Sequence, residues 1–407
     1  MVGAESRGTN LSDLGKLVEV REGLARLLVP DLSKYARGRH VEPRWAPVFY
    51  NPRVTLSRHL DVLALLAHVR AGERLSLVCD LLSATGVRGL RYLLESGVGE
   101  AVLNDADPKA CKLMAVNAAL NGLESRTEVL NTEANVLLSQ RAARGPKFDA
   151  IDIDPFGTPV PFIDTALKAV RNRGLLLITA TDLAPLMGAK EAACVRKYSA
   201  RPMRCPFSRE LAVRILLGYI CRQAARYELA VEPLLSYSLP HLVRVHVRVV
   251  RGAARADESL SNLGLAYYCA RCGYRSLERG YPLPRPAAKC PRCSARLSVA
   301  GPLWVGPIWD PKFVGRLERA YKEASYLHSA ALSSMISRLR SESGAPPLYY
   351  TVEELSKLLG ASEPSPRALV EALRAEGFTA CRTHFDPKGL RTSADLDTLI
   401  YLARLSA

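Results

Sequence analysis

Two carboxylates and an aromatic ring stand together in the stretch 150–157, which reads Ala-Ile-Asp-Ile-Asp-Pro-Phe-Gly. Asp152 and Asp154 share one face of a predicted strand, because side chains alternate with a period of two, and Asp154 stands at its end. A carboxylate placed there, with a backbone carbonyl, can accept hydrogen bonds from the exocyclic amino group of a base. Phe156, after Pro155, can stack on a base that has left its helix. The stretch therefore indicates methylation of a base amino group, although an Asp-Pro turn alone is also common in structural loops.

A nucleoside cofactor is indicated by the loop that follows an earlier predicted strand. Asp80 ends that strand, and the small residues up to Gly89 let a ligand approach the backbone closely. Asp105 ends the next strand, where a carboxylate can accept both hydroxyls of a ribose. The loop has too few glycines for G-x-G-x-x-G and no phosphate cradle, which favours S-adenosylmethionine over NAD. The alternative is that Gly86 and Gly89 are only turn residues.

Four cysteines have the spacing of a metal site. Cys269-x2-Cys272 is followed after 17 residues by Cys290-x2-Cys293, which predicts one tetrahedral, structural zinc ion held by four thiolates. A redox pair or two disulfides are the alternatives. The cations around these cysteines predict a module that faces RNA: Arg271, Arg275, Arg279, Arg285, Lys289 and Arg292.

Alternating strands and helices must position the residues at 80–157. Strands are expected at 75–81, 101–104, 127–130, 150–153 and 175–179, and helices at 55–69, 87–95, 108–121, 161–170 and 209–226. This alternation predicts a parallel, doubly wound α/β sheet. The runs 231–237 and 242–250 predict an antiparallel hairpin that closes one edge of the sheet, and residues 17–29 predict a separate N-terminal hairpin.

The last third of the chain has a different pattern. Residues 311–340 predict one long helix or two, and Thr351 with Glu354 predicts a capping box. Ser365 followed by Pro366 begins a further helix, and the runs 378–385 and 390–393 flank a turn. Helix, helix and hairpin form a winged-helix-like pattern at 345–396.

The composition predicts a partner that is a polyanion. The chain has 407 residues and a formal charge of +16, and residues 241–300 alone carry 11 Lys or Arg against 3 Asp or Glu. Clustered basic charge favours nucleic acid, although a solvated basic surface is the alternative. The sequence has no apolar run long enough to span a membrane, and Met1–Gly8 lacks the layout of a secretory signal. We therefore expect a cytoplasmic protein without membrane association, and no obligate protein partner is evident.

Several long motifs resemble the tRNA guanine-N2 dimethyltransferases, which act on guanine 26. The resemblance runs from about residue 17 to 396 and includes the motifs VFYNPR (48–53), LSATGVRG (82–89), DIDPFG (152–157), TATD (179–182), RKY (196–198), RTHF (382–385) and RTSA (391–394). It implies a class I methyltransferase domain with an N-terminal hairpin extension at 1–262. A C-terminal tRNA-binding domain would follow at 263–407, with the zinc module at 266–300 and the winged-helix-like end at 345–396.

The resemblance also implies roles for single residues. S-adenosylmethionine would be bound by Arg58, Arg88, Asp105, Glu133 and Ala134, to which the fold argument adds Asp80. Asp154 would be the catalytic carboxylate, and the flipped guanine would lie against Phe49, Phe156 and Pro155. Zinc knuckles occur in only some members and are not essential to the chemistry. Arg58 and Arg88 as structural arginines, and Phe49 as a core residue, are the alternatives. We expect His384, in the predicted wing, to face RNA.

The expected activity is the transfer of one or two methyl groups from S-adenosylmethionine to N2 of guanine 26 in tRNA, giving N2,N2-dimethylguanosine. Two alternatives remain. One is a zinc-containing RNA-binding protein on a non-catalytic methyltransferase fold, which the presence of both Asp105 and Asp154 disfavours. The other is an amino-group methyltransferase acting on DNA or ribosomal RNA. The missing glycine fingerprint disfavours an NAD-dependent enzyme.

Overall fold

The computed structural model describes residues 11–37 and 40–405. The start of the chain, at which a signal peptide was not expected, lies outside the described residues. The chain forms two compact units: one runs to Asp154 and includes Lys168–Gly174 and Arg319–Leu332, and the other comprises Pro155–Leu167, Leu175–Glu318 and the residues from Ser333 onward. The boundary predicted at residue 262 stays a prediction.

A seven-stranded sheet has the order β10-β11-β9-β8-β5-β6-β7. Its strands are β5 (Leu77–Asp80), β6 (Glu100–Asp105), β7 (Thr127–Asn131), β8 (Phe148–Ile153), β9 (Val170–Ala180), β10 (Leu229–Leu239) and β11 (Leu242–Arg251). β5 pairs in parallel with β6 and β8, and β6 with β7, whereas β11 is antiparallel to both β9 and β10. The mostly parallel sheet with an antiparallel edge hairpin is confirmed. The strand order reverses beside β5, and ligands of open α/β sheets bind at the carboxyl ends of strands near such a point.

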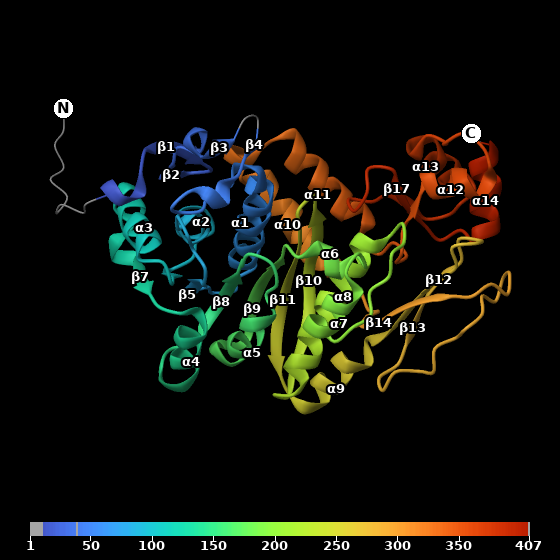
Figure 1. Ribbon diagram of the computed structural model, residues 1–407, viewed down its shortest axis with the longest axis horizontal. Coiled ribbons are helices and arrows are strands. Elements are labelled where there is room, and N and C mark those ends of the chain that lie inside the picture. Colours follow the sequence, from blue (N-terminus) through green and yellow to red (C-terminus); the bar gives the residue numbers. More distant parts are fainter. Residues whose placement is uncertain (1–10, 38–39, 406–407) are drawn as a thin grey trace. The chain divides into compact units, whose positions relative to one another are not determined.

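In the first unit, α1 (Thr55–Arg70), α2 (Val87–Glu95) and α3 (Pro108–Leu120) lie on one side of the strands and α4 (Ala134–Arg144) on the other (Figure 1). The predicted N-terminal hairpin consists of β1 (Leu17–Glu22) and β2 (Ala25–Pro30), and short strands β3 (Ala36–Arg37) and β4 (His40–Val41) follow it. The helices expected at 55–69, 87–95 and 108–121 are confirmed. The helix α4 was not predicted.

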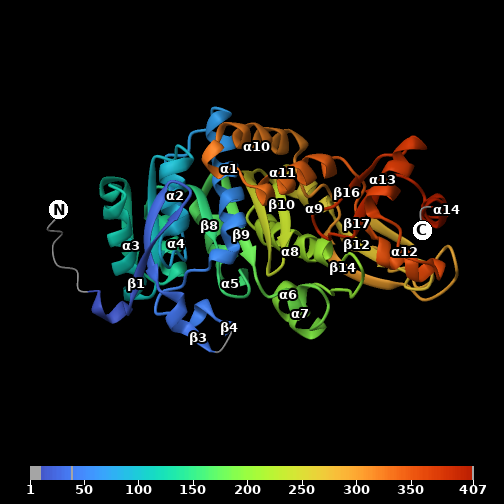
Figure 2. The same cartoon turned by 90° about the horizontal axis from the view of Figure 1, so that it is seen from above.

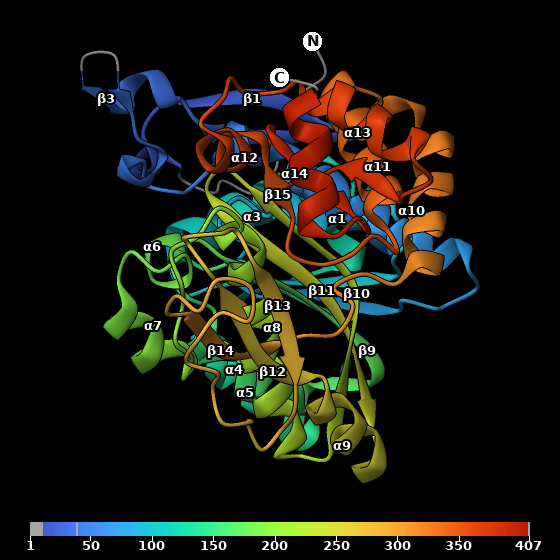
Figure 3. The same ribbon diagram turned by 90° about the vertical axis from the view of Figure 1, so that its right-hand side faces the viewer.

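The second unit contains α6 (Leu183–Leu186) and α7 (Glu191–Tyr198), which lie side by side in Figure 2, and the buried helix α8 (Ser208–Ala225). After α9 (Ala253–Ser261), three antiparallel strands have the order β13-β12-β14: β12 (Leu263–Tyr268), β13 (Arg275–Arg279) and β14 (Ser298–Trp304). Figure 3 shows the three strands beside one another.

Helices α10 (Pro311–Glu323) and α11 (Ala330–Glu342) show that the segment 311–340 forms two helices rather than one. A short strand β15 (Tyr350–Thr351) then precedes α12 (Val352–Leu359), α13 (Pro366–Ala375), β16 (Ala380–Arg382), β17 (Gly389–Thr392) and α14 (Leu396–Leu405). The sheet order β15-β17-β16 adds a strand to the predicted hairpin, and a buried core that includes Leu355, Leu369 and Leu399 joins the three helices. We call residues 346–405 the C-terminal module. Helix α5 (Val160–Ala169) lies between β8 and β9 in the sequence.

Among the described residues, none of the helices has both the length and the apolar character needed to cross a bilayer.

Candidate active site and metal centre

The loop after β5 is closely packed around Asp80. The Asp80 side chain is buried, and its Oδ2 accepts the Gly89 backbone N–H at 3.0 Å. A Cβ on Gly89 would lie 2.1 Å from Leu103 Cδ2 of β6. The first turn of α2 can therefore pack this closely against β6 because residue 89 has no side chain. Burial, and then the neighbouring Asp152 carboxylate, raise the pKa of Asp80 to about 7. Asp80 is therefore poised to change charge in the neutral pH range.

Asp105 at the end of β6 holds the same loop from the other side. One carboxylate oxygen accepts the Ala84 N–H at 2.9 Å and the other accepts the Asp107 N–H at 3.0 Å. Asn104, which the sequence analysis did not single out, donates to the carbonyl oxygens of Leu81 and Thr132. Asn104 thus ties the ends of β5, β6 and β7 together. The sequence signal was an Asn at a predicted strand end, directly before Asp105.

Asp154 follows β8 and forms an ion pair with Arg88 of α2. Arg88 Nε and Nη2 lie 2.9 and 2.7 Å from Asp154 Oδ2, and the other end of the guanidinium contacts Asp61 of α1. Burial opposes the charge of Arg88, but Asp154 and Asp61 keep the pKa of Arg88 well above its usual value. Asp154, the catalytic candidate, and Arg88, a cofactor candidate, are 66 residues apart in sequence and form one ion pair. Asp61 was missed because an acid inside an apolar helix gives no local signal.

Asp152, which lies in β8 two residues before Asp154, is not part of an open site. Asp152 is 1% exposed and accepts a hydrogen bond from Tyr92 of α2. Asp152 therefore helps to hold α2 against the sheet through Tyr92, and its carboxylate raises the pKa of Asp80.

The remaining first-unit candidates have local partners. Arg58 is buried and donates to Glu22 from Nε and Nη2, each at 2.6 Å, and also to the Asn51 carbonyl. Glu133 is the N-cap of α4 and accepts the Val136 N–H at 3.0 Å, while Ala134 is buried at the start of the helix. Phe49 is partly buried. Nε and Nη2 of Arg58 are thus engaged with neighbouring residues, and its role toward a cofactor stays a prediction.

In the second unit, the turn after Asp154 exposes an aromatic ring. The Phe156 side chain is 60% exposed, whereas Pro155 is buried. The Gly157 N–H donates to Thr181 Oγ1 at 2.7 Å, and the Thr181 N–H donates back to the Gly157 carbonyl at 2.8 Å. The exposed ring is therefore carried by a turn that is fixed at both backbone groups.

The same turn is braced from α7. Tyr198 donates to Asp182 Oδ1 at 2.6 Å and accepts from Thr158 Oγ1 at 2.9 Å, and Lys197 Nζ lies 3.0 Å from Asp182 Oδ2. The motifs 179–182 and 196–198, to which no role was given from sequence, thus form the support of the segment 155–158.

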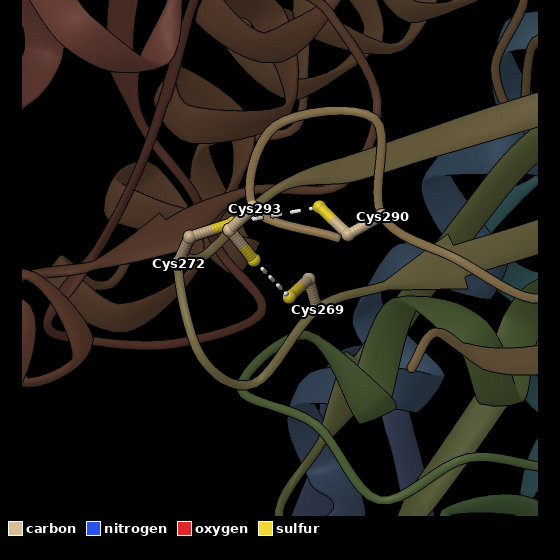
Figure 4. A group of neighbouring side chains, drawn as sticks. All are labelled: Cys269, Cys272, Cys290 and Cys293. Atoms are coloured by element: carbon tan, nitrogen blue, oxygen red, sulfur yellow. Dashed lines mark hydrogen bonds between the residues drawn. The ribbon is translucent and has the colours of Figure 1, made fainter. Parts of the chain in front are cut away.

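Four cysteine side chains point toward one another at the ends of β12 and β14 (Figure 4). The sulfur atoms all lie within 4.8 Å of one another, with 3.5 Å between Cys269 and Cys293 and 3.6 Å between Cys272 and Cys290. Tetrahedral zinc–thiolate bonds of about 2.3 Å require sulfur separations of about 3.8 Å, so the four cysteines fit the ion. In the described part of the chain all ten cysteines are free, and these sulfur separations exceed a disulfide bond.

The two knuckles have the same backbone design. Gly273 donates to the Cys269 carbonyl and Ser294 to the Cys290 carbonyl, and these two residues have φ of +78° and +58°. Gly273 thus holds the left-handed turn position of the first knuckle, and Ser294 holds the equivalent position of the second.

The motifs at 382–385 and 391–394 form a buried network rather than an RNA-facing wing. His384 has a side chain that is 1% exposed and lies 2.7 Å from Glu342 Oε1 through Nδ1. Arg391 is fully buried between Glu342 and Glu210, each at 2.8 Å. The expectation that His384 faces RNA is wrong, because its ring fills the space between α11 and the β16–β17 hairpin.

Comparison with known proteins identifies the family of this chain. The family described as N2,N2-dimethylguanosine tRNA methyltransferase matches residues 23–404. A tRNA (guanine(26)-N(2))-dimethyltransferase of Methanothermobacter thermautotrophicus is 40% identical over 93% of this chain and 97% of its own length. The protein of that name from Saccharolobus solfataricus is 38% identical over 94% and 98%. A solved complex of Trm1 from Pyrococcus horikoshii with S-adenosyl-L-methionine superposes with a TM-score of 0.80 at 35% identity, over 95% of this chain and 99% of that one.

Proposed function

Because the chain belongs to the N2,N2-dimethylguanosine tRNA methyltransferase family, we propose residue roles for its reaction. The protein is an S-adenosylmethionine-dependent tRNA (guanine-N2)-dimethyltransferase, which transfers one or two methyl groups to N2 of guanine 26. The single observation that carries the assignment of roles is Asp154, at the carboxyl end of β8 and paired with Arg88.

Asp154 is the catalytic carboxylate in this proposal. The N2 amine of guanine is a poor nucleophile because its lone pair is delocalised into the ring. Asp154 accepts an N2–H hydrogen bond, localises that lone pair and takes the proton as the new C–N bond forms and the bond between methyl and sulfur breaks, which leaves a neutral thioether. The sulfonium of the cofactor supplies an activated methyl group, so positioning of the amine provides most of the rate. A second transfer requires the remaining N–H to meet Asp154 again in a pocket with room for one methyl group.

The cofactor would be held at the carboxyl ends of β5, β6 and β7. Asp105 would accept the ribose hydroxyls, since each of its oxygens keeps a lone pair beside the backbone bond it accepts. Glu133 and Ala134 would border the base, and Arg88 would meet the carboxylate of the methionine part. Arg58 is retained as a cofactor residue in the proposal, supported by motif alone.

The affinity for S-adenosylmethionine is expected to rise with pH around neutrality. The pKa of Asp80 is raised to about 7, so its carboxyl is neutral below that pH and anionic above it. An anion favours a cationic sulfonium ligand, and we therefore expect the dissociation constant to fall about threefold to tenfold between pH 6 and pH 8. Titration calorimetry at several pH values measures this, and Asp80→Asn should flatten the profile. An equal pH dependence in Asp80→Asn would assign the titration to another group.

Phe156, with Phe49 and Pro155, is proposed to hold the flipped guanine. The exposed ring of Phe156 on its fixed turn supports this role. Stacking on a base is worth about 1–3 kcal/mol, so Phe156→Ala should raise the KM for tRNA about 5- to 150-fold in steady-state assays. Leu24→Ala, which removes an exposed apolar side chain from the N-terminal hairpin, is the matched control and should leave KM unchanged. An unchanged KM in Phe156→Ala would remove the ring from the base pocket.

The partner is tRNA, and we propose the cytoplasm as the location, since the charge of +16 suits a polyanion substrate found there. We further propose that residues from 263 onward form the tRNA-binding part, including the exposed cations Arg271, Arg279, Arg285 and Lys289. Binding should accordingly weaken steeply as salt is added.

Nucleoside mass spectrometry of tRNA after incubation with the protein and S-adenosylmethionine tests the assignment. N2-methylated and N2,N2-dimethylated guanosine at position 26 are expected. Absence of both products, with cofactor binding intact by calorimetry, would favour a non-catalytic RNA-binding protein. Labelled methyl transfer to duplex DNA or ribosomal RNA instead of tRNA would favour the other amino-methyltransferase.

A further inference from the structure

The six cations around the metal cysteines divide into two groups. Four of them extend into solvent: Arg271, Arg279, Arg285 and Lys289. The other two, Arg275 and Arg292, contact the C-terminal module, and their side chains are 3% and 33% exposed. That the module faces RNA stays a prediction, and it would rest on the four exposed cations rather than on Arg275 and Arg292.

Arg275 lies three residues after Cys272 and is enclosed by the C-terminal module and by aromatic rings. Its guanidinium forms an ion pair with Glu354 of α12 and donates to the Tyr349 carbonyl at 2.6 Å. The same group lies 3.9 Å from the ring centre of Tyr350 and 4.8 Å from that of Phe207. A cation with this many aromatic and charged neighbours fixes the geometry of both segments it joins.

Glu354 is accordingly used differently from the capping box that the sequence predicts. Thr351 does cap α12 by accepting the Glu354 N–H, but the Glu354 carboxylate accepts from Arg275 and, at 2.9 Å, from Tyr268 of β12. Both donors belong to the strands that lead into and out of the first knuckle. The Glu354 carboxylate therefore joins the first turn of α12 to the first knuckle through Tyr268 and Arg275.

Arg292 lies between Cys290 and Cys293 and joins three segments. It donates to the Cys272 carbonyl of the other knuckle at 3.3 Å and pairs with Asp397 in the first turn of α14. Gly273 adds a direct contact with α12, since a Cβ there would lie 2.7 Å from Leu358 Cδ1. Both knuckles thus contact the C-terminal module through residues adjacent to the metal ligands.

The knuckles have little apolar core of their own. Cys269 and Cys290 are themselves members of a small buried cluster with Leu265, Tyr267 and Leu297. Loops of this kind take up a single conformation when a metal joins their thiolates, and metal binding then contributes directly to folding. The positions of Gly273, Arg275 and Arg292 consequently depend on the ion.

We propose that the metal-loaded knuckles are the support that holds the C-terminal module in place, with Arg275 and Arg292 as the positioning residues that connect them. In the tRNA methyltransferase proposed above, the ion then acts on tRNA affinity through α12 and α14, and not on the cofactor or on Asp154. The tRNA part of this inference rests on the proposed function, whereas the structural coupling does not.

Hydrogen–deuterium exchange of the full-length zinc protein tests the coupling without tRNA. Chelation of zinc should speed amide exchange in α12 and α14 at least about fivefold, and leave the calorimetric affinity for S-adenosylmethionine unchanged. Arg292→Gln, in zinc-loaded protein of unchanged metal content, should speed exchange in α14, and Arg275→Gln should do so in α12. Arg271→Gln, on the same knuckle but exposed, is the matched control and should leave exchange in both helices unchanged.

The kinetic arm uses the two variants with tRNA. Both should raise the KM for tRNA about tenfold with kcat nearly unchanged, and Arg275→Lys should recover part of the loss because it keeps the charge near Glu354. If zinc removal leaves the exchange of α12 and α14 unchanged, the support role is overturned. If exchange changes but KM does not, the link to tRNA affinity is overturned and the structural coupling stands. Failure of the mass spectrometric test, with exchange behaving as expected, would overturn the proposed function alone.

Discussion

Asp154→Asn is expected to lower the rate of methyl transfer to tRNA by about 10²–10³-fold, because it removes the anion that, in the proposed mechanism, binds N2–H and takes its proton. Cofactor binding should remain near normal. Asn retains a side-chain oxygen that can accept from Arg88, so the local structure is better preserved than in Asp154→Ala, which leaves Arg88 with Asp61. Single-turnover transfer of labelled methyl groups to tRNA, with calorimetry for the cofactor, measures both quantities.

The matched control is Asp257→Asn, which makes the same change at an exposed position of α9. It should transfer methyl groups at the rate of the unmodified protein. If Asp154→Ala or Asp154→Asn kept more than about a tenth of that rate, another group would have to be the proton acceptor.

Arg391→Met is expected to destabilise the fold by about 3–5 kcal/mol, because it leaves two buried carboxylates without their shared cation. Arg391, Glu210 and Glu342 are all fully buried. Burial acts to raise the pKa of Glu342, but His384 and Arg391 lower it to about 2. A lowered carboxyl pKa stabilises the fold at pH above the ordinary value near 4.5, and this contribution is lost as the pH falls toward 2. In Arg391→Met the pKa of Glu342 rises, so acid unfolding should begin at higher pH.

Urea unfolding at pH 7, and a series of unfolding midpoints between pH 2 and pH 6, measure these two effects. Arg367→Met removes an exposed arginine from the same C-terminal module and should leave both unchanged. A midpoint of Arg391→Met equal to that of the unmodified protein would mean that the two carboxylates find other partners.

The chemistry-bearing residues were predictable where the chain is locally informative. A strand that ends in Asp154-Pro-Phe and a pair of C-x-x-C turns each encode their geometry within a few residues, so the sheet edge and the metal site could both be inferred. Family resemblance added the list of cofactor candidates, which the geometry leaves as proposals.

Interactions between distant segments could not be predicted. Arg88 with Asp154, and Arg391 with Glu210, join residues far apart in sequence, and a charged residue in a helix or hairpin gives no sign that it is buried. For the same reason the sequence gives no sign that His384 is buried. The helix α14 was missed because its exposed face carries the apolar residues Tyr401 and Leu405, which obscure the amphipathic pattern.

The turn that carries Phe156 has a thermodynamic consequence. An exposed aromatic side chain on a mobile loop loses conformational entropy when it is immobilised on a ligand, which weakens binding. Here the Gly157 N–H already donates to the Thr181 side chain, and the Thr181 N–H donates to the Gly157 carbonyl. The hydrogen bond from Tyr198 to Asp182 holds the adjoining segment. That ordering takes place when the protein folds. In the role proposed for Phe156, the base would therefore meet a preorganised turn and would lose mainly its own conformational freedom.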